Sequence, residues 1–211
     1  MKKGALIKPP ALRRGDGVGI VSPAGPVREA QLHDGLKHLE SSGFEVHMAP
    51  HVYAKGEYLA GEDPLRLADL HAMFLSPEIK AILCSRGGYG SLRLLDRLDY
   101  HLVRKHPKIL VGFSDITALL MALYHQGGLV TFHGPMVVNL ASIRSSSWTH
   151  LCGVLCENHP VTLRYKEGTV LSEGRGVGPL LGGNMSLICH LLGTPFFPSL
   201  KGAILCLEDR G

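Results

Sequence analysis

The sequence has no apolar run of about 18 residues, the length that a membrane-spanning helix needs, so no transmembrane segment is expected. Between Met1 and Pro10, lysines and two prolines stand where a secretory signal has its apolar core. This argues against export and predicts a cytoplasmic protein. Aromatic residues make up only 6% of the chain and do not alternate with its scattered Lys and Arg, so a nucleic-acid-binding surface is not expected either.

Cysteine occurs in an odd number and without the spacing of a zinc site. The five cysteines lie mostly in apolar runs, which is typical of reduced core thiols in a reducing compartment. Cys152 and Cys156 are separated by three residues, but no second pair of ligands completes a metal site. We therefore expect no metal and no other cofactor. The cysteines are Cys84, Cys152, Cys156, Cys189 and Cys206.

The chain does contain enough apolar residues for a substantial core. Of its 211 residues, 45% are hydrophobic and 19% are charged, which is ordinary for a soluble globular protein. Over the first two thirds, short apolar runs alternate with amphipathic stretches, and this alternation predicts an α/β fold with a parallel sheet. The predicted strands are 18–22, 44–48, 79–84, 109–111 and 129–132, and the predicted helices are 29–42, 115–125 and one that Asp63 caps and Pro64 begins.

After Pro135 the pattern changes. We expect a domain over residues 1–140, a connector over 141–175 that starts with the serine-rich segment 142–148, and the incomplete beginning of a smaller α/β domain over 176–211. The predicted elements of this part are strands at 161–165 and 169–171, a helix over 185–192 after the segment 178–184, and an apolar strand over 203–207.

The segment Gly112-Phe113-Ser114-Asp115 lies directly between a predicted strand and a predicted helix. This is the context of a nucleophile elbow, in which a sharp turn projects the serine hydroxyl above the sheet. The N–H of Asp115, at the start of the helix, is then placed to stabilise an oxyanion. The motif is incomplete, because Ile116 replaces the last glycine of G-x-S-x-G. By itself, the motif favours Ser114 or Asp115 as a simple helix N-cap over a nucleophile.

A glycine-rich turn, Arg86-Gly87-Gly88-Tyr89-Gly90, follows another predicted strand. It matches neither the dinucleotide-binding nor the phosphate-binding glycine motif, which argues against a nucleotide site. One interpretation is a tight turn that uses left-handed glycine conformations. The other is that its backbone N–H groups approach the same acyl oxygen as that of Asp115, because the carboxyl ends of parallel strands meet at one edge of the sheet.

Glu208 is the acidic residue best placed to orient a catalytic histidine, because it follows an apolar strand. A surface carboxylate at a strand end is the alternative. Among the twelve histidines, His133 at a strand end is a candidate to line a cleft, but none stands out as the base.

Several short sequence blocks, among them the elbow at 112–115 and the glycine-rich turn at 86–90, together resemble the LD-carboxypeptidases, which include microcin-immunity peptidases. The resemblance implies a flavodoxin-like or class I amidotransferase-like N-terminal domain, a smaller α/β C-terminal domain, and an active site between them. It implies Ser114 as nucleophile, the N–H groups of Gly88 and Asp115 as oxyanion hole, and Glu208 as triad acid. The blocks, in the family's order, are 58–61, 66 with 69–70, 82–90, 107–108 with 111–117, 132–135, 182–184 and 204–209.

The family's activity is metal-independent hydrolysis of an amide bond next to a C-terminal residue. The resemblance thus implies a serine carboxypeptidase that releases the terminal D-alanine of a murein tetrapeptide during peptidoglycan recycling. Hydrolysis of peptidyl nucleotides of the microcin C type is the alternative activity, and a homodimer is the implied assembly. A glutamine amidotransferase would need a cysteine where Ser114 stands.

One member of the implied triad is not found in the sequence. The family's catalytic histidine comes from a glycine-flanked segment downstream of the triad glutamate, and the sequence ends three residues after Glu208. We therefore expect these 211 residues to be inactive or impaired as a peptidase. The alternative from a different class is a catalytically dead module that binds a murein peptide.

Overall fold

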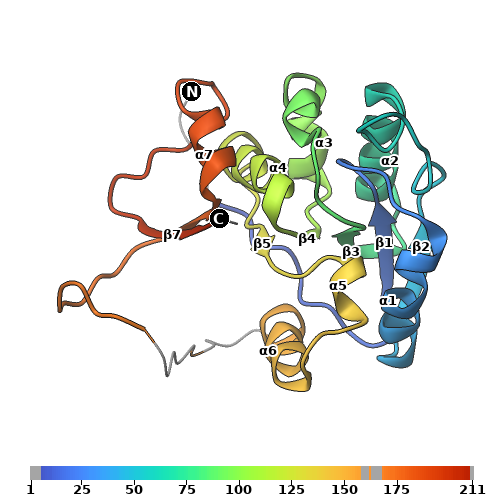
Figure 1. Ribbon diagram of the computed structural model, residues 1–211, viewed down its shortest axis with the longest axis horizontal. Coiled ribbons are helices and arrows are strands. Elements are labelled where there is room, and N and C mark those ends of the chain that lie inside the picture. The colour runs from blue at the N-terminus through green and yellow to red at the C-terminus, as the bar shows by residue number, and fades with distance from the viewer. Residues whose placement is uncertain (1–5, 158–161, 163–167, 210–211) are drawn as a thin grey trace.

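A five-stranded parallel sheet with the order β2-β1-β3-β4-β5 forms the centre of the molecule (Figure 1). The computed structural model describes residues 6–157, 162 and 168–209. Every pairing in this sheet is parallel, so the predicted α/β class is confirmed and the carboxyl ends of the five strands share one edge. The strands are β1 (Gly17–Val21), β2 (Glu45–Met48), β3 (Ile79–Cys84), β4 (Ile109–Gly112) and β5 (Phe132–His133).

Helices cover both faces of the sheet, with α2, α3 and α4 on one side and α1, α5 and α6 on the other (Figure 1). None of the helices in the described part of the chain is long and apolar enough to cross a membrane. The helices are α1 (Glu29–Ser41), α2 (Asp63–Leu75), α3 (Tyr100–Lys105), α4 (Thr117–Ala122), α5 (Val137–Leu140) and α6 (Ser145–Cys156). Short 3₁₀ turns span Ser91–Arg97 and Ser114–Ile116, and a π turn spans Leu123–Gly127.

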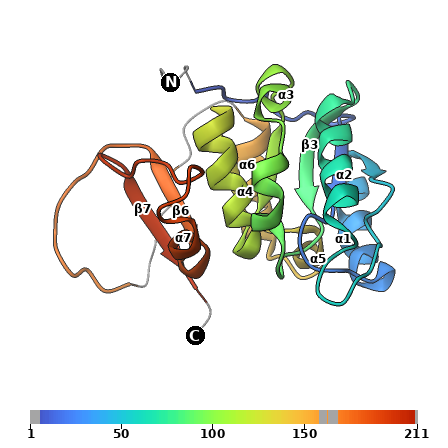
Figure 2. The same cartoon turned by 90° about the horizontal axis from the view of Figure 1, so that it is seen from above.

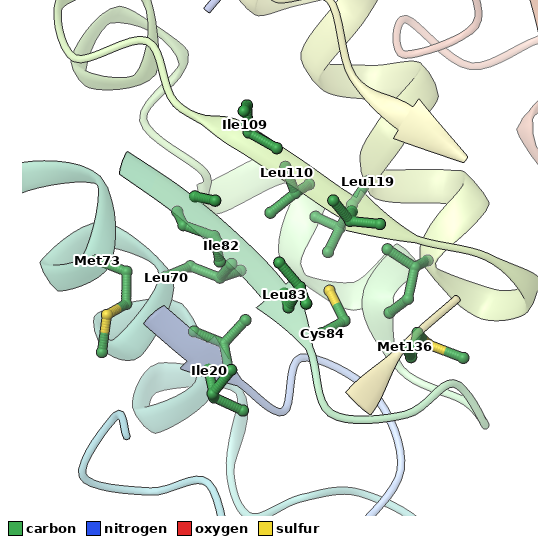
Figure 3. Close-up of a cluster of buried hydrophobic side chains, with 14 of the residues drawn as sticks. Ile20, Leu70, Met73, Ile82, Leu83, Cys84, Ile109, Leu110, Leu119 and Met136 are labelled. Carbon is green, nitrogen blue, oxygen red and sulfur yellow. The ribbon is translucent and has the colours of Figure 1, made fainter. Parts of the chain in front are cut away.

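The core lies between the sheet and these helices. Ile20, Ile82 and Leu110 come from three neighbouring strands and are completely buried (Figure 3). On one face, Leu70 of α2 and Leu119 of α4 pack into the same cluster and are also buried. Strands β1 and β4 are buried along their whole length, and β3 at every position except Lys80. These strands therefore occupy the middle of the sheet, where both faces exclude water.

The start of α2 differs from the prediction. Asp63 is the first helical residue rather than the N-cap, and the N-cap is Glu62. The Asp63 carboxylate instead forms ion pairs with Arg66 and Arg93. Both arginines bind the Asp63 carboxylate, so its charge serves ion pairs rather than the cap of its own helix.

A second sheet of two parallel strands, β6 (Leu180–Asn184) and β7 (Ile204–Glu208), lies beside α4 (Figure 2). Helix α7 (Met185–Leu191) follows β6 directly, as predicted for this segment. The strand at 180–184 was not predicted, because Gly182 and Gly183 interrupt its apolar pattern. Both glycines adopt positive φ angles of 141° and 130°.

The segment predicted as a connector begins with structure. Residues Ser145–Cys156 form helix α6, so the polar serines at 145–147 start a helix rather than a linker. Helix α6 is held against the segment that precedes β1, since the Leu12 N–H donates to the Leu155 carbonyl at 2.9 Å. The predicted strand at 169–171 is wrong, because these residues are irregular, and the predicted strand at 161–165 lies outside the described residues apart from residue 162. The domain division at 140 and 176 stays a prediction.

Candidate active site

Ser114 occupies a strained turn at the carboxyl end of β4. Its φ angle is +59°, and it is the one non-glycine residue with positive φ in the part of the chain that the structure describes. A left-handed conformation costs a residue with a Cβ about 1–2 kcal/mol. Phe113 before it is extended, and a 3₁₀ turn starts at Ser114 and leads into α4. Strain of this kind concentrates at functional sites, where the surrounding structure maintains it.

A helix cap does not account for this geometry. The N-cap positions are Phe113 for the 3₁₀ turn and Ile116 for α4. The Asp115 carboxylate accepts the backbone N–H of Ser91 at 2.9 Å, so it faces a different loop. The side chain of Ser114 is partly exposed at this edge of the sheet.

Gly112 makes the sharp turn sterically possible. A Cβ at this position would lie 2.6 Å from Cγ2 of Ile116 and 2.9 Å from its Cβ. Any side chain would therefore push the turn away from β4. The elbow needs glycine two residues before the serine for close packing, and Ile116 occupies the space that a second glycine would leave open.

The glycine-rich loop after β3 lies against the Ser114 hydroxyl. A Cβ on Gly87 would be 3.2 Å from both Cβ and Oγ of Ser114. Gly88 and Gly90 have φ angles of 124° and 129°, which an L side chain adopts only with strain. The Gly87 carbonyl accepts the N–H of Gly25 at 3.2 Å, which holds the loop against the segment after β1. The structure therefore places the glycine-rich loop, at Gly87, against Ser114.

Gly87→Ala is a small change with a direct effect on this contact. Its added methyl group forces Ser114 or the loop to move by a few tenths of an ångström, and we expect turnover to fall about tenfold while folding is retained. Gly153→Ala in α6 is the matched control, because its nearest neighbour would be at an ordinary 4.0 Å. Peptide hydrolysis and thermal unfolding of both variants are the measurements, and equal turnover in the two would contradict the proximity of loop and hydroxyl.

The buried Asp115 connects the glycine-rich loop after β3 to the turn at Ser114. Its side chain is 2% exposed and accepts the Ser91 N–H, while the Ser91 hydroxyl donates to the Asp115 carbonyl at 2.5 Å. Burial raises the pKa of Asp115, although hydrogen bonds from Ser91 and Gly90 and the nearby Arg66 charge act in the opposite direction. The Asp115 carboxyl is thus a structural acceptor that fixes the start of the turn. Its role in the oxyanion hole, through its backbone N–H, remains a prediction.

Glu208 is the last residue of β7 and pairs in register with Asn184 of β6. Its Oε1 atom is enclosed and has no hydrogen-bond partner among the described residues. His133 lies within its electrostatic reach and stands opposite Gly112 in the β4–β5 register. Loss of hydration lowers the pKa of His133, and the Glu208 carboxylate opposes this effect. The second sheet therefore brings Glu208 to the edge of the first sheet that carries Ser114.

Thr117 and Asn184, to which the sequence alone assigned no role, hold the two sheets together. The Thr117 hydroxyl, three residues after Ser114, accepts the N–H of Asn184 at 3.0 Å. Asn184 also caps α7 through the Leu187 N–H and donates to Asp209 at 3.1 Å. An asparagine directly before an apolar helix is a local signal for the cap. The contact with Thr117 has no local signal.

No group of three or more His, Cys, Asp or Glu side chains that could hold a metal ion occurs in the described part of the chain. A surface groove of about 630 Å³ lies near the glycine-rich loop but does not include Ser114 or Glu208. Residues 55–59, 61–64, 93 and 97 line it. Charges of both signs line this groove, so it does not by itself indicate a ligand.

Two family models match the chain, the LD-carboxypeptidase N-terminal domain over residues 18–134 and the LD-carboxypeptidase C-terminal domain over residues 177–211. A probable murein peptide carboxypeptidase of Bacillus subtilis is 41% identical over 206 residues, 96% of this chain and 65% of that protein. A murein tetrapeptide carboxypeptidase of Pseudomonas aeruginosa is 36% identical, over 92% of this chain and 66% of that protein. The chain thus spans about two thirds of the length of these relatives.

The fold also matches solved structures. The crystal structure of an MccF-like protein from Bacillus anthracis has a TM-score of 0.89 and 31% sequence identity, and covers 96% of this chain and 70% of that one. The likeness extends over both sheets, because nearly the whole chain is covered.

Proposed function

Because the chain belongs to the LD-carboxypeptidase family, we propose that it acts as a serine carboxypeptidase on murein peptides. The reaction is hydrolysis of the L,D amide bond that releases the terminal D-alanine of a murein tetrapeptide. The observation that carries this proposal is the strained Ser114, whose hydroxyl lies against a glycine loop at the carboxyl edge of the sheet. The names of the Bacillus and Pseudomonas relatives support the substrate class.

In the proposed mechanism, Oγ of Ser114 attacks the carbonyl carbon of the scissile amide and its proton passes to a general base. The carbonyl oxygen becomes an oxyanion that accepts hydrogen bonds from the backbone N–H groups of Gly88 and Asp115. The tetrahedral intermediate collapses, the C–N bond breaks, and the protonated base gives its proton to the leaving amine of D-alanine. Water then hydrolyses the acyl-serine by the same steps in reverse order, which restores Ser114.

Glu208 is the proposed orienter of the base. Its enclosed and unpartnered oxygen is suited to accept the N–H of an imidazole, which fixes the tautomer and stabilises the imidazolium. The base is the one member of the proposed triad that we do not assign to a residue of this chain. The reduced state expected for the five cysteines agrees with a cytoplasmic location, and a homodimer is part of the same proposal.

The test is release of D-alanine from L-Ala-γ-D-Glu-meso-diaminopimelate-D-Ala. Because the chain spans about two thirds of its relatives, the assay is run on the chain alone and on the chain joined to the C-terminal third of the Bacillus relative. We expect the joined protein to be much faster, since the family's base is not found among the 211 residues. No release by either protein would rule out the carboxypeptidase.

The second candidate is hydrolysis of peptidyl nucleotides, as in microcin immunity. It is favoured by the close match to the MccF-like structure, MccF being a microcin C7 self-immunity protein. One MccF structure contains aspartyl sulfamoyl adenosine, so this compound is the discriminating probe. Turnover of the aspartyl nucleotide without release of D-alanine from the tetrapeptide would establish the second candidate over the first.

A further inference from the structure

Arg66 is a buried cation that the proposed chemistry does not use. It lies in the first turns of α2 with only 2% of its surface exposed, and full burial is rare for arginine unless its charge is paired. Its Nη2 forms an ion pair with Asp63, and its Nη1 donates to the carbonyl oxygens of Pro23 and Gly90. An ion pair with Asp63 alone would not require the guanidinium to reach two backbone carbonyls from other segments.

The two carbonyls belong to loops at the catalytic edge of the sheet. Pro23 follows β1, and Gly90 ends the glycine loop that follows β3. The distance from Nη1 to the Gly90 oxygen is 3.1 Å, and a Cβ on Gly90 would lie 2.8 Å from the same nitrogen. The guanidinium therefore approaches the loop backbone so closely that position 90 must be glycine.

From Gly90 the chain of contacts continues to the nucleophile. Ser91, the next residue, donates its N–H to the Asp115 carboxylate and its hydroxyl to the Asp115 carbonyl. Asp115 directly follows Ser114. At the other end of the loop, Gly87 lies against the Ser114 hydroxyl. Arg66 thus anchors one end of a loop whose other end touches the serine.

We propose that Arg66 is a positioning residue for the oxyanion hole: its guanidinium fixes the backbone of residues 86–91 so that the N–H of Gly88 faces the developing oxyanion. This inference rests on the proposed serine mechanism. The rigid cross-link matters because a backbone donor that shifts by about 1 Å loses much of its stabilisation of the transition state. Substrate binding that does not depend on the oxyanion should be unaffected.

Arg93 provides the matched control. It also binds Asp63, through Nε at 3.0 Å and Nη2 at 2.9 Å, but its side chain is exposed. Arg93 contacts the Gly90 carbonyl through its backbone N–H, at 3.2 Å, a bond that a side-chain substitution leaves in place. Arg93→Met therefore removes a partner of Asp63 and a side-chain interaction with Tyr89, but no side-chain contact with the loop backbone. A difference between variants at 66 and 93 isolates the contact of the Arg66 guanidinium with the backbone carbonyls.

The experiment compares Arg66→Met, Arg66→Lys and Arg93→Met in the most active form of the protein, with the tetrapeptide as substrate. We expect kcat of Arg66→Met to fall about tenfold to hundredfold with KM nearly unchanged, because only the transition state uses the oxyanion hole. Lysine keeps a cation with several donors, so Arg66→Lys should recover part of kcat. Arg93→Met should stay within about twofold of the wild type.

Hydrogen exchange gives a readout that does not depend on turnover. In Arg66→Met the amides of residues 86–91 should exchange faster, while those of β3 and β4 keep their protection. Absence of activity in both the chain and the joined protein would refute the proposed function, and the exchange data would still test the loop. Unchanged kcat, a loss confined to KM, unaltered loop exchange, or failure of both Arg66 variants to fold would overturn the proposal.

Discussion

Alanine at position 114, in the chain joined to the C-terminal third of the Bacillus relative, is expected to lower the turnover of the murein tetrapeptide by about 10⁴-fold or more, to the residual rate that binding and the oxyanion hole provide. The reason is that the acyl-enzyme cannot form without Oγ, and no neighbouring hydroxyl occupies the elbow. Gly112 and the loop at Gly87 keep their packing in this variant, since both contacts are set by the backbone turn. The fold should therefore be retained.

Ser147→Ala is the control for this variant, because Ser147 is an exposed serine of α6 outside the proposed site. It should match the wild type in turnover and thermal unfolding. The Ser114→Ala protein should still bind the tetrapeptide, which calorimetry measures directly. Near-normal turnover in Ser114→Ala would remove this residue from the role of nucleophile, whereas loss of binding together with turnover would indicate that the elbow has collapsed.

In the same joined protein, Glu208→Ala is expected to lower turnover by about 10²- to 10⁴-fold, less than Ser114→Ala. The smaller loss follows from its proposed role, because Glu208 orients the base and does not itself attack. Its stability cost should be low, since the enclosed Oε1 makes no hydrogen bond among the described residues that the substitution could break. Glu208→Gln keeps the shape and an acceptor but removes the charge, so it should lie between alanine and the wild type.

The control for Glu208 is Glu173→Gln, which removes an exposed carboxylate from the chain preceding the second sheet. Turnover, KM and thermal unfolding are measured for all three variants. If Glu208→Ala turns over the tetrapeptide as fast as the control, Glu208 is only a residue at a strand end. Parallel loss of stability and activity would indicate that it supports the docking of β7 instead.

Much of the fold follows from local patterns in the sequence. The run at 79–84, apolar except for Lys80, is strand β3 at the same residues. The predicted strands at 18–22, 109–111 and 203–207 are β1, β4 and β7 with ends shifted by one residue. Hydrophobic period and the turn chemistry of glycine act over a few residues, so they can be recognised without tertiary information. The parallel orientation of the strands follows from the alternation of strands and helices.

The candidate site could be predicted only in part. Ser114 and the glycine loop each follow a buried strand, and neighbouring strand ends meet at one edge, so their proximity was expected. The resemblance to a family was needed to choose the nucleophile over a helix cap. The positive φ angle of Ser114 is a backbone conformation that the residue type disfavours, and it persists because Gly112 and Ile116 pack closely around the turn.

Sequence alone therefore determined the α/β class, the main strands and the segments that carry the candidate chemistry, because these depend on propensities of neighbouring residues. Tertiary structure alone decided that Arg66 reaches Gly90 and that Thr117 holds Asn184. It also decided that Asp63 pairs with two arginines instead of capping α2. Apart from the pair of Asp63 with Arg66 within α2, these contacts join residues from separate elements, and their stability comes from burial and charge pairing that exist only once the elements have packed.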